Sequence, residues 1–89
     1  MTDFHISDVR IVPVHPVGGL VAFASCIINN KLYLGSIAIH EKLDGSGLRL
    51  TYPTKKAGTQ NLTIFHPVEP YLSKAMEQAI FAEYERLYG

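Results

Sequence analysis

The alternation of apolar and polar residues predicts a β-strand near the start of the chain. Within the segment 6–14, Val9 and Ile11 alternate with charged residues, as in a strand with one face in water. Pro13 near the end of this segment lacks an amide hydrogen for a sheet ladder. We therefore expect the first strand to lie at the edge of a sheet.

Two longer apolar runs, 20–28 and 32–40, flank the polar triplet Asn29, Asn30 and Lys31 and predict the clearest hairpin of the chain. Both runs are apolar at nearly consecutive positions, FASCII and YLGSIAI. Such runs are typical of strands covered on both faces, or on one face by another subunit. This pattern favours a homodimer.

A polar, glycine-bearing loop at 41–47 precedes a fourth alternating strand at 48–52, and 62–65 is a candidate for a short fifth strand. The connection between these two segments contains the stretch KKAGTQN. Its polar composition predicts a flexible hairpin tip or lid.

The period changes to that of a helix after Pro70, with apolar residues at spacings of three and four as far as Leu87. Proline suits a first helical turn, Glu69 complements the positive end of the helix dipole, and Arg86 lies in the last turn. The helix should run from about 70 to 88. The whole pattern predicts an α+β fold, a small antiparallel β-sheet of four to five strands with one C-terminal α-helix, in a single domain spanning 1–89.

Composition narrows the choice of environment and partner. The chain has 89 residues, 47% of them hydrophobic, with eight basic and eight acidic side chains, so its total charge gives no general attraction to nucleic acid or membrane. The uncharged stretch 11–30 contains prolines and glycines that break a membrane helix. With no signal-peptide layout and one cysteine, we expect a cytoplasmic protein without a membrane span.

Candidate catalytic chemistry is weak. The four histidines have no ligand-like spacing, and His66 before Pro67 is better explained by a ring nitrogen bonding a backbone group. Cys26 lies in an apolar run and should be a buried, inert thiol. The tyrosines could stack on bases, but their spacing favours the core. We therefore expect no catalytic residue, no metal and no cofactor, and a protein that is not an enzyme.

The remaining candidates are basic. Lys55 and Lys56 follow a proline, and composition alone favours a solvated turn over phosphate contact. Arg49 points to the strand face opposite its neighbouring leucines and could extend a basic patch, with Lys74 on the helix as a further member.

The order of motifs along nearly the whole chain resembles the stage V sporulation protein G (SpoVG) family of bacterial septation proteins. Members have an opening T-D-V-R, a central M-P-S-K-R, an I-T-H-P and a closing E-Y-x-R-L. The matching residues here are Asp8, Val9 and Arg10; Pro53, Lys55 and Lys56; His66 and Pro67; and Glu83, Tyr84, Arg86 and Leu87. The second basic position is lysine instead of arginine, which removes a bidentate contact to phosphate or guanine.

The resemblance implies a dimeric cytoplasmic regulator linked to septation and sporulation that binds DNA and RNA site-selectively. It assigns nucleic-acid contacts to Lys55 and Lys56. The alternative is a protein interaction module that affects septum formation through a division-protein partner, with the apolar hairpin or a free strand edge as the contact surface.

Overall fold

The computed structural model describes residues 4–89 and contains two antiparallel sheets and one helix. A four-stranded sheet has the order β1-β2-β3-β4, and a separate two-stranded sheet pairs β5 with β6. The elements are β1 (Ile6–Val17), β2 (Leu20–Ile28), β3 (Leu32–Glu41), β4 (Leu48–Thr51), β5 (Thr54–Ala57), β6 (Gln60–Thr63) and α1 (Pro70–Tyr88). The predicted α+β class is confirmed.

The predicted central hairpin is formed by β2 and β3. Asn29 and Asn30 both have positive φ angles, 52° and 56°. Lys31 N donates to Ile28 O at 3.0 Å, an ordinary backbone hydrogen bond that closes a tight turn. Asparagine tolerates this left-handed backbone better than most residues do. The tip is joined to the segment just before β1, because Asn29 N donates to His5 O at 2.7 Å. β1 lies at the sheet edge, as predicted.

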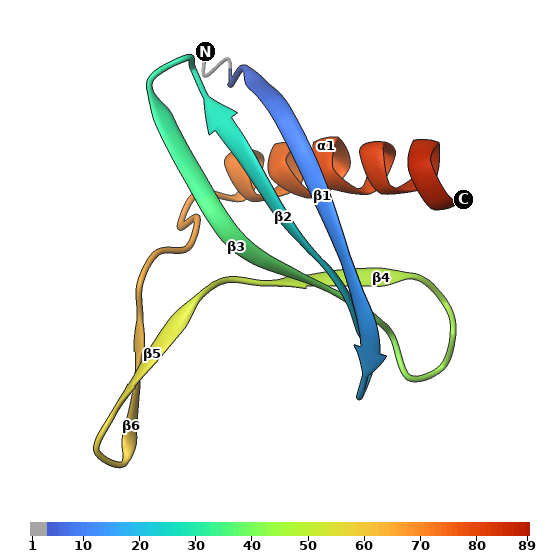
Figure 1. The fold of residues 1–89 in the computed structure, drawn as a ribbon. Coiled ribbons are helices and arrows are strands. Elements are labelled where there is room, and N and C mark those ends of the chain that lie inside the picture. The colour runs from blue at the N-terminus through green and yellow to red at the C-terminus, as the bar shows by residue number, and fades with distance from the viewer. Residues whose placement is uncertain (1–3) are drawn as a thin grey trace.

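The largest difference from the sequence prediction is the segment 54–63, which we call the arm. The segment expected to be a flexible hairpin tip or lid is a regular hairpin of β5 and β6, closed by a turn in which Gly58 has a φ of 63°. The candidate fifth strand at 62–65 overlaps β6 at Leu62 and Thr63 only. Every residue of both strands is exposed, and the arm extends away from the four-stranded sheet (Figure 1). Backbone pairing defines these strands, so apolar residues in the sequence indicated only the end of β6.

Helix α1 has the predicted bounds and lies across one face of the four-stranded sheet (Figure 1). Its first turn is capped by Glu69, whose carboxylate accepts from Leu72 N at 2.8 Å and from Tyr71 N at 3.1 Å. The fully buried side chains of Met76 and Ile80 supply the helix side of the core. The whole core consists of Val21, Ala22, Ala24, Cys26, Ile28, Ile37, Ile39, Met76 and Ile80.

The sheet face away from α1 is not covered by any other part of the described chain. Alternation along β2 and β3 places Phe23 and Tyr33 on this side, with 38% and 67% of their surfaces exposed. The apolar runs that predicted a hairpin covered on both faces thus have one covered face within a single chain.

Candidate nucleic-acid interface

The predicted lysine pair lies on a strand of the arm. Lys55 is paired with Leu62, and Lys56 with Asn61. Because consecutive residues of a strand point to opposite faces, the two ammonium groups leave the ribbon in opposite directions. Adjacency in the sequence therefore gives one cation on each face of the arm, not two on one surface.

The arm has a net positive charge. It contains two lysines and no acidic residue. In residues 4–89, the ion pair found is Arg86 with Glu83, at 2.7 Å, and neither arm lysine has a carboxylate at such a distance. The positive charge of Lys55 and Lys56 is therefore available to an external anion.

The other two predicted basic residues lie elsewhere. Arg49 is exposed on β4, opposite His40 on β3, and lines a surface depression with Lys42 and Asp44 beside the 42–47 loop. That loop and the arm leave opposite ends of β4 (Figure 1). Lys74 is exposed in α1. The four cations thus come from three elements, and only the lysine pair shares one.

Arg49 has an electrostatic effect on its neighbour. The Nε2 of His40 lies 2.9 Å from Thr51 Oγ1, and its Nδ1 is buried without a partner in the described residues. Burial, and secondarily the positive charge of Arg49, lower the pKa of the His40 imidazole. His40 is therefore held neutral near pH 7 and adds no charge to this surface.

The structural roles predicted for His66 and Cys26 are supported. His66 Nδ1 lies 3.2 Å from Pro67 O, the backbone contact that the sequence suggested. Cys26 is fully buried, and burial raises the pKa of its thiol. A buried, protonated thiol is a poor nucleophile.

Two further features of residues 4–89 concern metal ligands and membrane spans. No group of three or more His, Cys, Asp or Glu side chains is placed to hold a metal ion in this part of the chain. Its single helix, α1, lacks the apolar length required to cross a membrane.

Comparison with known proteins gives a family. The SpoVG family model matches residues 4–86. A protein of Alkaliphilus oremlandii (strain OhILAs), named "Putative septation protein SpoVG", is 31% identical over 83 residues, covering 92% of this chain and 87% of the relative. A protein of the same name from Geobacillus thermodenitrificans (strain NG80-2) is 31% identical over 84 residues, covering 92% and 84%. The match of motifs, family model and relatives over nearly the whole chain means that this protein belongs to the SpoVG family.

Proposed function

We propose that this protein is a non-enzymatic cytoplasmic regulator linked to septation and sporulation, which binds DNA or RNA as a homodimer through Lys55 and Lys56. The names of its relatives support the link to septation. The observation that carries the nucleic-acid assignment is the arm, a projecting ribbon with two cations and no acidic residue.

The opposite orientation of the lysines suits a groove. The major groove of B-DNA is wide enough to admit a two-stranded β-ribbon, and phosphates border it on both sides. A ribbon with Lys55 on one face and Lys56 on the other can direct one ammonium group to each border. On a flat anionic surface only one of the two lysines would make contact.

A second copy would give the arm more support and a second lysine pair. An isolated two-stranded hairpin is marginally stable in water. Leu62 on the arm and Ile64 beside it are exposed by 50% and 60%, and Val68 in the following linker by 85%. Contact between these apolar side chains and a second subunit would bury them, while the long side chain of Lys55, which shares the face of Leu62, extends past the contact to its phosphate. Two arms in one dimer would bind cooperatively through effective concentration.

The test is fluorescence anisotropy with labelled duplex DNA over a series of salt concentrations. Each phosphate contact contributes a slope of about 0.9 to the fall of log affinity with log salt. We expect Lys55→Ala and Lys56→Ala each to remove one phosphate contact for every arm bound, and so to reduce the slope by about 0.9 per arm. The double variant should lose two contacts per arm. A matched control, Lys42→Ala, removes an exposed lysine in the 42–47 loop and should leave the slope unchanged.

An unchanged salt slope in the double variant would remove the arm from the proposed interface. Sedimentation of the unlabelled protein tests the dimer separately, because Leu62→Ser should shift the mass toward the monomer if the arm contacts a second copy. Loss of the dimer with intact duplex binding would restrict the proposal to a monomeric regulator.

The second candidate function is a protein interaction module for a division protein. The exposed apolar side chains of Leu62, Ile64 and Val68 favour it. Exposed apolar side chains that lie close together along the chain often mark a surface for protein contact. This function predicts capture of a protein partner that is insensitive to salt, with no anisotropy change on DNA or RNA. The Leu62→Ser variant would then lose the partner, whereas Lys55→Ala/Lys56→Ala would retain it.

A further inference from the structure

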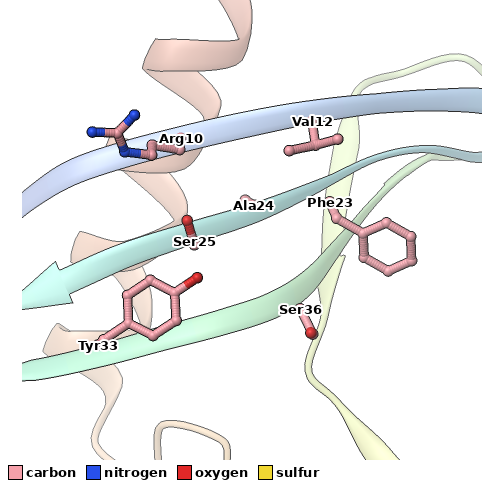
Figure 2. Close-up of a pocket in the computed structure, with 7 residues that line it drawn as sticks. All are labelled: Arg10, Val12, Phe23, Ala24, Ser25, Tyr33 and Ser36. Carbon is pink, nitrogen blue, oxygen red and sulfur yellow. The ribbon is translucent and has the colours of Figure 1, made fainter.

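The sheet face away from α1 contains a shallow hollow with a volume of about 320 Å³ (Figure 2). Its rim and floor come from the three adjacent strands β1, β2 and β3. We call the surface formed by Arg10, Val12, Phe23, Ser25, Tyr33 and Ser36 the open sheet face. Arg10 is the only charged member of this set.

The hollow has a cause in the sheet register. On β1, Asp8 and Val9 together face the single residue Cys26 of β2, and Asp8 has a φ of 51°. On β3, Gly35 and Ser36 together face Ser25, and Ser36 has a φ of 61°. Each extra residue forms a β-bulge, which bends its strand and increases local twist. Two bulges on either side of one stretch of β2 thus shape this face into a depression.

The position of the Tyr33 ring depends on Gly35, two residues further along β3. A Cβ atom built on Gly35 would lie 2.9 Å from the Tyr33 hydroxyl and 3.0 Å from its Cε2, so only glycine leaves room for the ring in this position. The ring therefore rests against the backbone while 67% of the residue stays exposed. An aromatic ring held in this way offers its outer surface for stacking.

We propose that the open sheet face binds single-stranded RNA, which rests on the proposed nucleic-acid function and assigns it a second contact surface. One unpaired base stacks on Tyr33, a second base of the same strand packs on Phe23, and the Arg10 guanidinium pairs with a phosphate between them. Bases inside a duplex are stacked on both sides, so a ring on a sheet can reach only an unpaired base. The hydroxyls of Ser25 and Ser36 line the hollow and can exchange hydrogen bonds with a ribose 2′-OH.

Charge favours RNA over a second copy of the chain at this face. A two-fold dimer through the open sheet face would place the same patch on both sides of the contact. Each side would bring Arg10 and no carboxylate among its lining residues, so no side chain lining the hollow would pair with either guanidinium after it lost its water. A phosphate supplies the missing negative charge.

The test is anisotropy with a labelled single-stranded RNA of mixed sequence, about 12 nucleotides long, within the range that small single-strand binding folds cover. We expect Tyr33→Ala to weaken RNA binding about tenfold, a typical loss for one stacked base, and to leave duplex DNA binding unchanged. Tyr33→Phe keeps the ring and should bind as the native protein does. Gly35→Ala displaces the ring without removing it and should also weaken RNA binding.

Other outcomes separate the possibilities. Native-like RNA binding by Tyr33→Ala would overturn the proposed sheet site even if the arm variants lose duplex affinity. Equal affinity for the deoxyribose oligonucleotide would overturn the assignment to RNA. A shift of Tyr33→Ala from dimer to monomer in sedimentation would make this face a subunit interface and also overturn the proposal. If the native protein binds neither single strands nor duplexes, the sheet site and the proposed function both fail.

Discussion

The rings of Tyr52 and Phe65 pack edge to face, with centroids 6.0 Å apart and an interplanar angle of 66°. Tyr52 precedes β5 and Phe65 follows β6, so this contact joins the two ends of the arm. Ile64 N also donates to Pro53 O at 2.9 Å, which extends the pairing toward the sheet. Both rings pack against the core. The arm is thus exposed along its length but anchored at its base.

The hydroxyl of Tyr52 gives the first prediction. This oxygen is buried and has no hydrogen-bond partner within residues 4–89. An unsatisfied buried polar group is unfavourable, so Tyr52→Phe should keep or raise the free energy of unfolding, by up to about 1 kcal/mol. Urea denaturation measures the change, with Tyr33→Phe on the exposed ring as a matched control. A loss of more than about 1 kcal/mol would mean that the hydroxyl makes a stabilising bond.

Stability at high pH gives the second prediction. Burial, with smaller effects from Glu77 and Cys26, raises the pKa of Tyr52 to about 12 from an ordinary value of 10.0. The unfolded chain therefore loses this proton first, and the folded state becomes less stable as pH rises from 10 toward 12. We expect Tyr52→Phe to lose less stability than the native protein over that window in urea denaturation. Parallel losses in both proteins would contradict the assignment.

Patterns that depend on burial were predictable from the sequence. The apolar runs flanking Asn29 and Asn30 predicted the central hairpin because both strands contribute to one core. The spacing after Pro70 predicted α1 to its last residue because one stripe of that helix must cover the sheet. In both elements, the need to bury apolar side chains produces a pattern of apolar positions that can be recognised in the sequence.

The arm and the open sheet face could not be predicted in the same way. The strands of the arm bury nothing, so the sequence indicated a hairpin tip and a short strand at 62–65 but not the bounds of β5 and β6, which backbone hydrogen bonds define. Arg10, Phe23 and Tyr33 lie on one face because of the strand register and the two bulges. Neither the register nor the bulges produce a local pattern that can be recognised in the sequence. Sequence spacing marked Tyr33 as a core residue, whereas Gly35 allows its ring to rest on the surface.

The hairpin tip gives the third prediction. Asn30 has a φ of 56°, and its side chain makes no hydrogen bond within the described chain. An alanine in this left-handed conformation is less favourable by about 1 kcal/mol, whereas glycine adopts it freely. We expect Asn30→Ala to lower the thermal midpoint and Asn30→Gly to match or exceed the native value. Equal midpoints for the two variants would contradict a conformational origin.

The start of α1 gives the fourth prediction. The Glu69 carboxylate accepts hydrogen bonds from the amides of Tyr71 and Leu72, which have no carbonyl partner within the helix. Glu69→Ala should lower the free energy of unfolding by about 1 kcal/mol, the usual effect of losing such a cap. Glu69→Asp retains a carboxylate and should recover most of the loss in the same urea titration. An alanine variant as stable as the native protein would show that water satisfies these amides equally well.

The pKa of His40 gives the last prediction, and its sign follows from the lowered value. Burial and then the charge of Arg49 lower this pKa from 6.5, so the unfolded chain takes up the proton at a higher pH than the folded protein does. The stability contributed by neutral His40 is therefore complete above pH 6.5 and is lost as pH falls through and below that value. His40→Gln cannot take up this proton, so its stability should fall less on acidification than that of the native protein. NMR titration of the imidazole tests the cause directly. Arg49→Gln should raise the His40 pKa only part of the way toward its ordinary value, because burial is the larger effect, and full recovery would assign the shift to Arg49 alone.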